Sequence, residues 1–343
     1  MTLPQTGPGV AHSGTGEASA ATRHEFAALR STCGLCDLRT RAKLILTGQD
    51  RTRWLNGMVT NNVRDLAEGQ GVYAFLLNPQ GHILGDLYAY HRGDSLLVDT
   101  DRAQLEKIRA TFDHYIIMDD VEVADADDKL AALGVAGPAS REVLRRAGID
   151  VPDLTPLQFV DVDWQQAPLT LVHGDNASRE WFEIWTAPEH FDKLQAALIA
   201  AGAVPVGAEA LELNRIADGV PRYGQDIRER DLPQETEQAR ALHFSKGCYV
   251  GQEIVERIRS RGGVHRTFTG FSVEGPLPTP GAKIRAEEKD VGEITSSAQL
   301  PVEGGDRTVA LGYIRKEAVN KKLSAGEARL TVCALGSGGL LKN

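Results

Sequence analysis

The amino-acid sequence changes character near Gly263–Arg266, and this change limits the folds that the chain can adopt. Before this point, patterns typical of amphipathic helices alternate with short strands and tight turns. After it, the apolar pattern is that of strands alone, separated by Gly and Pro turns at a spacing typical of a small barrel or sandwich. These strands are predicted over Phe268–Val273, Lys283–Arg285, Gly292–Ser296, Val309–Arg315 and Arg329–Ala334.

The part before this point is long enough for two modules. The turn Asn78–Gly81 joins two apolar strands as a hairpin, and Asp101–His114 carries apolar residues at the three- and four-residue spacing of a helix. Antiparallel hairpins packed against helices are typical of the α+β class. We therefore predict a disordered tail over 1–23, rich in small residues, α+β modules over 24–124 and 125–264, and a β-domain over 265–343.

Composition narrows the classes of function. The net charge of −9 argues against general binding to nucleic acid or membrane surfaces, although it permits a local basic site. Four scattered cysteines are too few for a disulfide framework. No apolar run is long enough to span a membrane, and no secretory signal pattern opens the chain. These features predict a cytoplasmic protein, and we expect a monomer.

Residues 246–253, Lys-Gly-Cys-Tyr-Val-Gly-Gln-Glu, form the most informative octet of the chain. A thiol, Cys248, stands beside a cation, Lys246, which favours the thiolate form. The glycines Gly247 and Gly251 allow close approach of backbone or ligand. A reactive cysteine is one interpretation; a small, buried apolar side chain is the other.

The remaining chemical candidates are weaker. Cys33 and Cys36 have the spacing of a metal or redox pair, but without further ligands they are interpreted as incidental, and no metal is predicted. No dinucleotide or P-loop motif is present. Asp86 and Glu183 each interrupt an apolar strand, so each faces either solvent or a pocket. Three arginines after the octet make a basic island, which is either a solvated helix face or an anion site: Arg257, Arg259 and Arg261.

The octet resembles the signature of the YgfZ-type folate-binding proteins, which are relatives of the glycine cleavage T-protein and of a mitochondrial iron–sulfur assembly factor. The resemblance covers roughly residues 25–335 and includes Leu76–Gly81 and Gly219–Gly224. It implies a cloverleaf of two α+β modules, the second ferredoxin-like, and a C-terminal β-barrel. These surround a channel that holds tetrahydrofolate.

The same resemblance assigns candidate roles to single residues. Those expected to contact folate are Tyr73, Glu183, Arg215, Tyr249 and Gln252, and those of chemical interest are Cys248, Lys246 and Asp86. Gly247, Gly251 and Glu253 complete the motif. Asp86 matches the second member of an acid pair in the T-protein, whereas Gly85 replaces the first. Because aminomethyl transfer needs an acid placed at the folate nitrogens, the replacement of the first acid by Gly85 counts against that activity.

Three functions follow from the resemblance. The first is a tetrahydrofolate-binding accessory protein for assembly or repair of iron–sulfur clusters, which indirectly supports iron–sulfur enzymes, including tRNA-modifying ones. The second is a folate-dependent one-carbon transferase. The third is a non-catalytic, folate-regulated binding module. The expected partners are folate, iron–sulfur assembly or client proteins and, at Arg257, Arg259 and Arg261, RNA.

Overall fold

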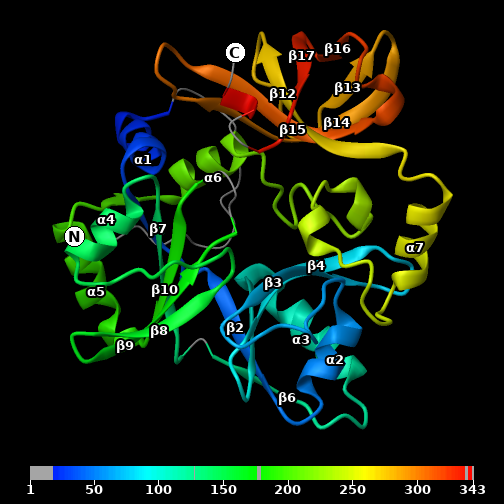
Figure 1. Cartoon of the computed structure of the whole chain (residues 1–343). Helices are drawn as coiled ribbons and strands as arrows, with labels where there is room; N and C mark the ends of the chain where they lie inside the picture. The colour runs from blue at the N-terminus through cyan, green and yellow to red at the C-terminus, as the bar shows by residue number, and fades with distance from the viewer. Residues whose placement is uncertain (1–17, 127, 176–178, 337–338, 342–343) are drawn as a thin grey trace.

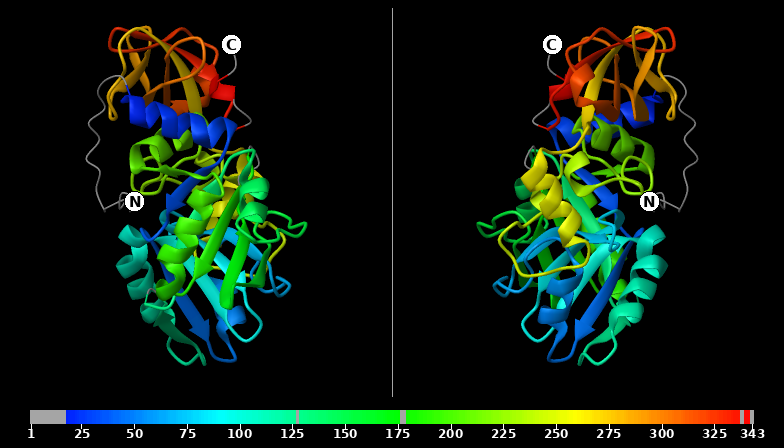
Figure 2. Two further views of the ribbon diagram at one scale, coloured as in Figure 1. Left: turned by 90° about the vertical axis from the view of Figure 1, so that its left-hand side faces the viewer. Right: turned by 90° about the vertical axis from the view of Figure 1, so that its right-hand side faces the viewer.

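The computed structural model describes residues 18–126, 128–175, 179–336 and 339–341. The predicted α+β class is confirmed, and the C-terminal strands form a closed barrel rather than a sandwich. Two sheets with their helices lie below the barrel (Figure 1), and edge-on views place the barrel and the five-stranded sheet at opposite ends of the molecule (Figure 2). Among the described residues, no helix combines the length and the apolar character needed to cross a membrane.

The five-stranded sheet has the order β3-β4-β5-β2-β6 and is antiparallel throughout. One face packs against α2 (Arg51–Met58) and α3 (Leu105–Tyr115) in a core that contains Trp54, Leu55 and Phe112. The other face contributes Phe75, Leu77 and other side chains to a central core. The strands are β2 (Arg41–Thr47), β3 (Gly71–Leu77), β4 (Ile83–His91), β5 (Leu96–Asp101) and β6 (Glu122–Asp125).

The six-stranded sheet has the order β11-β1-β7-β10-β9-β8, and only β1 and β11 pair in parallel. Its outer face is covered by α4 (Ser140–Arg146) and α5 (Pro188–Ala200), and its inner face joins the central core. The strands are β1 (Gly34–Asp37), β7 (Ala131–Ala136), β8 (Phe159–Trp164), β9 (Ala167–His173), β10 (Trp181–Thr186) and β11 (Val204–Val206).

The start of the chain belongs to this second sheet. Helix α1 (Ala20–Ser31) packs against α6 (Ala208–Ala217), and β1 then pairs with β7, before the chain enters the first sheet at β2. Helix α1 begins at Ala20, whereas the sequence predicts order from His24; residues 1–17 of the predicted tail lie outside the described residues. The division into domains by residue range stays a prediction.

The barrel has the strand order β12-β15-β14-β13-β16-β17 and a filled interior that includes Phe271, Ile294 and Ile314. Helix α7 (Gln252–Arg261) precedes it, and Gly262, in the left-handed region at φ 118°, ends that helix. The strands are β12 (Arg266–Glu274), β13 (Lys283–Ala286), β14 (Lys289–Leu300), β15 (Arg307–Arg315), β16 (Leu323–Ala325) and β17 (Ala328–Cys333).

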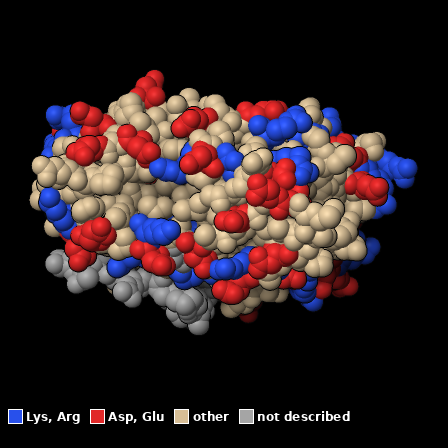
Figure 3. Space-filling model, turned by 90° about the horizontal axis from the view of Figure 1, so that it is seen from below, with Lys and Arg blue, Asp and Glu red and all other residues tan. Residues whose placement is uncertain are grey.

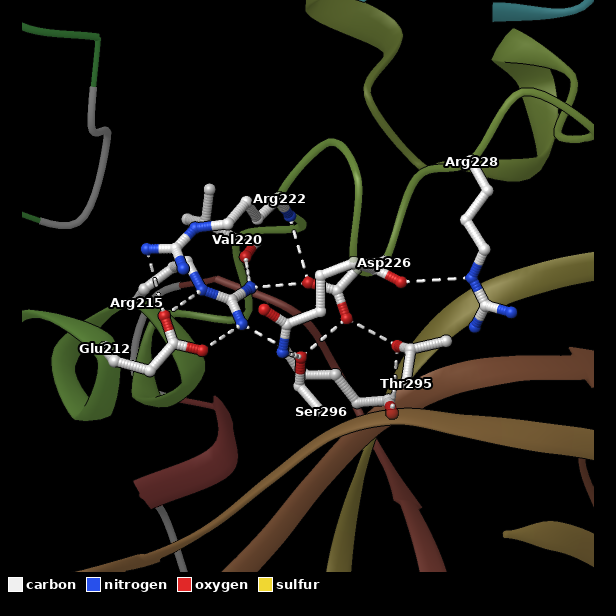
Figure 4. A network of polar contacts seen from close by, with 10 residues as sticks. Glu212, Arg215, Val220, Arg222, Asp226, Arg228, Thr295 and Ser296 are labelled. Carbon is white, nitrogen blue, oxygen red and sulfur yellow. Dashed lines mark hydrogen bonds and ion pairs between the residues drawn. The ribbon is translucent and has the colours of Figure 1, made fainter. Parts of the chain in front are cut away.

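A buried ion pair joins the barrel to the rest of the molecule (Figure 4). Arg215 of α6 donates from Nη1 to Asp226 Oδ2 at 2.7 Å, and Asp226 is fully buried. Asp226 also accepts from the hydroxyls of Thr295 (2.5 Å) and Ser296 (2.7 Å) on β14, and from the backbone N–H of Arg222 (3.0 Å). Four donors thus satisfy this carboxylate, which makes it the joint between α6, the loop that follows and the barrel.

We expect Asp226→Asn to lower the free energy of unfolding by about 3–5 kcal/mol, because it breaks a buried ion pair of Arg215 and puts a neutral amide among four donors, leaving Glu212 as the other carboxylate paired with Arg215. Urea denaturation followed by circular dichroism measures this change. Asp290→Asn is the matched control, since Asp290 forms an exposed pair with Arg285 on the barrel and its loss changes stability by about 1 kcal/mol at most. Equal urea midpoints for the two variants would show that Asp226 does not stabilise the contact between α6, the loop and the barrel.

Candidate functional site

Strand alternation brings the sequence-predicted residues of β4 and β10 to the inner faces of the two sheets. On β4, Asp86, Tyr88 and Tyr90 share one face, while Leu87 and Ala89 enter the core beneath α2 and α3. On β10, Trp181, Glu183 and Trp185 face inward in the same way, and the residues between them pack on the outer core. Because side chains of a strand alternate between faces, each of these carboxylates lies among the inward-facing aromatic residues of its strand.

These inner faces line a cavity of about 1540 Å³ that α6, the loop after it and the barrel complete. Tyr73, Asp86, Glu183 and Arg215, all singled out from the sequence, line it together. Trp181 comes from the second sheet and Phe268 from the barrel, so all three units contribute to the wall. The cavity exceeds the roughly 300–1,000 Å³ of an ordinary small-molecule pocket.

Asp86 is held by neutral donors on both carboxylate oxygens. The Tyr73 hydroxyl donates to Oδ2 at 2.7 Å, and the Gln104 amide donates to Oδ1 at 2.7 Å. Burial raises the pKa of Tyr73, so this hydroxyl remains a donor. Gln104 was missed by sequence reasoning, because no local pattern distinguishes this glutamine on the short turn before α3 from a solvent-facing one.

Glu183 has one oxygen bound and one available. Trp185 Nε1 donates to Oε2 at 3.0 Å, and Oε1 has no hydrogen-bond partner among the described residues. The rings of Tyr88, Tyr90 and Trp185 adjoin this carboxylate: Tyr88 and Tyr90 stack at 6.4 Å, and Tyr90 meets Trp185 edge-on at 5.0 Å. The side chain therefore offers a charged acceptor beside flat aromatic walls.

The arginines of the cavity are already engaged by the protein. Every N–H of the Arg215 guanidinium has an acceptor: Glu212 takes Nε and one Nη2 hydrogen, Ser296 the other, and Val220 and Asp226 take those of Nη1. Arg240 lies 4.3 Å over the Tyr73 ring and pairs with Asp175. Acidic side chains outnumber arginines along the described wall, so the cavity favours ligands that donate hydrogen bonds.

The octet does not line this cavity; it docks on the first module. The ammonium group of Lys246, which is 7% exposed, donates to three backbone carbonyls, those of Asn56 (2.5 Å), Val59 (2.6 Å) and Asn61 (2.7 Å). Burial lowers the pKa of Lys246, and the three carbonyl acceptors oppose this by matching the three donors of the charged form. No hydrogen bond joins Lys246 to Cys248 among the described residues.

The rest of the octet forms a close backbone contact with the β3–β4 hairpin. Gly251 has φ 83°, and a Cβ there would lie 2.6 Å from the carbonyl oxygen of Asn78. This position therefore requires glycine for both its conformation and its contact. The Tyr249 ring is buried, which raises its pKa to about 12, and its backbone N–H donates to the side chain of Gln252 at 3.3 Å. Tyr249 and Gln252 thus hold the turn itself.

The residues of the octet that face solvent are Gly247, Cys248 and Glu253. Arg257, Arg259 and Arg261 are also exposed on α7, where Arg259 lies 4.5 Å over the ring of Phe244. The thiol and the three arginines of α7 therefore all face the outside of the molecule, and none of them lines the cavity.

Cys33 directly precedes β1 and Cys36 lies within it, and both side chains are buried. Burial raises the pKa of the Cys33 thiol to about 11 and that of Cys36 further, which makes both poor nucleophiles. Among the described residues, no group of three or more His, Cys, Asp and Glu side chains is placed to hold a metal ion.

Comparison with known families and structures agrees with this architecture. Residues 8–246 match the GCVT N-terminal domain, and residues 264–335 match the C-terminal β-barrel domain of CAF17. The glycine cleavage system aminomethyltransferase T of Bartonella henselae has the same fold: the TM-score is 0.81 at 20% identity, over 92% of this chain and 89% of that one.

Two curated relatives match most of the chain. An aminomethyltransferase of Rubrobacter xylanophilus is 29% identical over 302 residues, which cover 87% of this chain and 80% of the relative. A putative chloroplastic transferase of Arabidopsis thaliana is 26% identical over 85% of this chain and 68% of the relative. The chain is thus a member of the GCVT N-terminal domain family, within the glycine cleavage T-protein superfamily, and it carries a CAF17-type β-barrel at its C-terminal end.

Proposed function

We propose that this protein binds tetrahydrofolate in the central cavity and serves as an accessory protein for iron–sulfur cluster assembly or repair. One observation carries the folate part of the proposal. Two carboxylates from different sheets, Asp86 and Glu183, enter one aromatic-walled cavity, and their hydrogen-bond partners there are neutral donors. Each therefore has spare acceptor capacity for a ligand.

A reduced pterin matches this chemistry. Its ring presents an amino group and ring N–H groups, which are donors for carboxylate oxygens, and its flat body fits between aromatic side chains. The free Oε1 of Glu183 suits the pterin edge, and Tyr88 and Tyr90 of the cavity wall lie nearby. Arg215 supports the cavity wall in this proposal rather than the ligand, since all its donors are used.

The accessory role is supported by the octet and its placement. The octet resembles that of the YgfZ-type proteins and of an iron–sulfur assembly factor, and its thiol faces solvent. We propose that Cys248 contacts a partner protein or a transient cluster, since one cysteine cannot hold a stable cluster. Lys246, Tyr249, Gly251 and Gln252 then present the thiol by fixing the octet on the first module.

We also propose RNA as a partner at Arg257, Arg259 and Arg261. All three side chains are exposed on α7, which favours this contact. The mixed charges on another part of the surface limit the area that RNA could contact. On the face shown in Figure 3, blue and red side chains are interspersed, with no broad basic surface. An RNA contact in this proposal is therefore local to α7, and its affinity falls with added salt.

One-carbon transfer is the second candidate, favoured by the position of Asp86 in the cavity and by relatives that are named aminomethyltransferases. Asp86 would then act on the folate nitrogens as an acid or base. Gly85 in place of the first acid of the T-protein pair weighs against it. Turnover of a methylamine donor with tetrahydrofolate, abolished by Asp86→Asn, distinguishes this candidate from binding alone.

Tetrahydrofolate titration by calorimetry in deoxygenated buffer tests the cavity. We expect Glu183→Gln to weaken binding by about 10-fold or more, because a neutral amide with one acceptor oxygen replaces a carboxylate that accepts charge-assisted hydrogen bonds through two oxygens. Glu189→Gln is the matched control, since Glu189 is an exposed residue of α5 outside the cavity wall. Tight binding by Glu183→Gln, or no binding by the wild type, would count against the proposal.

A deletion strain complemented with variants tests the thiol. We expect Cys248→Ala to leave tetrahydrofolate binding unchanged but to lower the activity of iron–sulfur enzymes severalfold in the cell. Cys333→Ala is the control, because Cys333 is a partly exposed thiol on the barrel. Full restoration of iron–sulfur enzyme activity by Cys248→Ala would remove the proposed role of this thiol.

A further inference from the structure

We propose that Gln104 is a positioning residue for the ligand-binding carboxylate of Asp86, and that Gly85 is small in order to admit it. The inference rests on the proposed folate function and deepens it. The T-protein resemblance implies a pair of acids, of which Asp86 matches the second. In this inference the amide of Gln104, together with Gly85, takes the place of the first. No direct contact between Gln104 and the ligand is required.

Gln104 engages Asp86 through both ends of its amide. Its Nε2 donates to Asp86 Oδ1 at 2.7 Å, and its Oε1 accepts from the backbone N–H of Asp86 at 3.0 Å. The two bonds fix the rotation of the carboxylate relative to its own backbone. Gln104 is 5% exposed, so the amide has little freedom to move away. It lies on a short turn at Arg102–Gln104, whose N-cap Asp101 accepts from the N–H of Ala103.

Gly85 provides the space for this arrangement. A Cβ at position 85 would lie 3.0 Å from Gln104 Oε1, and Ile108 of α3 closes the space behind it at 3.5 Å. A side chain here would push the amide away from Asp86. Glycine at 85 and glutamine at 104 thus form one unit, although they are 19 positions apart in the sequence.

The result is a carboxylate aimed at the cavity with a single fixed orientation. Tyr73 fixes Oδ2 and Gln104 fixes Oδ1, and each oxygen keeps a lone pair for a ligand donor. A fixed acceptor loses less conformational entropy on binding than a free one, which strengthens binding. Loss of the Gln104 amide should therefore weaken the ligand even though the Asp86 carboxylate remains.

Gln104→Glu separates positioning from a packing role by its pH profile. At pH 5.5 a proton shared between the two carboxyls can take the place of the Nε2 donor, whereas at pH 8.5 both are ionised and repel each other. The titratable groups that face Asp86 are Tyr73, Tyr88 and Tyr223, whose pKa values burial raises, so they stay uncharged in this range. Arg240, over Tyr73, stays charged throughout.

The experiment is calorimetric titration of tetrahydrofolate into full-length wild type, Gln104→Leu and Gln104→Glu at both pH values. We expect Gln104→Leu to bind about 10-fold more weakly at each pH. Gln104→Glu should bind as the wild type does at pH 5.5 and at least about 10-fold more weakly than the wild type at pH 8.5. Gln195→Leu, which removes a buried glutamine of α5 outside the cavity wall, should bind as the wild type does.

Two results would overturn the inference: wild-type affinity for Gln104→Leu, or equal weakening of Gln104→Glu at both pH values while circular dichroism shows an intact fold. A structural defect alone gives the second pattern, because protonation does not rescue it. Absence of binding by the wild type would instead overturn the proposed folate function, and this inference with it.

Discussion

The Arg215–Asp226 ion pair is the contact on which the shape of the cavity depends. It is buried where α6, the loop after it and the barrel strand β14 meet, and each of these elements contributes to the cavity wall. Separating this buried pair would be strongly destabilising, so the two residues hold α6, the loop and β14 in one arrangement. Every guanidinium N–H of Arg215 has a protein acceptor. In the proposed function Arg215 therefore supports the cavity wall, and Asp86 and Glu183 offer acceptors to the ligand.

Much of this site could be predicted from local sequence. On β10, Trp181, Glu183 and Trp185 share one face, and on β4, Asp86, Tyr88 and Tyr90 do the same. An acid on the aromatic side of such a strand points to a pocket rather than to solvent, and both acids do line the cavity. The change of pattern near Gly263–Arg266 likewise marked the barrel, whose first strand begins at Arg266.

What could not be predicted depends on contacts between distant residues. The pairing of β1 with β7 and β11 places the start of the chain in the second sheet, and no local pattern specifies that partner. Gln104 resembles any polar residue at a helix start until Asp86 is brought within 2.7 Å of it. Lys246 precedes Cys248 by two residues, and from the sequence alone this cation is expected to favour the thiolate. In the structure its ammonium group instead donates to three backbone carbonyls of the first module. In each case long-range packing decides which neighbour a polar group meets.

The cavity and the octet are separate sites, but one hairpin connects them. Tyr73 of β3 and Asp86 of β4 bond to each other in the cavity wall, and the turn that joins these strands contacts Gly251 and Ile254. The contact with Gly251 leaves no room for a side chain, and Gly81 is equally close to Ile254, at 2.7 Å from a Cβ built there to Ile254 Cβ. Such close packing makes the position of the octet depend on that of the hairpin. Gly251 of the octet and Gly81 of the turn are therefore required by the same constraint, since together they hold the octet, with its exposed thiol, against the hairpin whose strand β4 carries the cavity-facing carboxylate of Asp86.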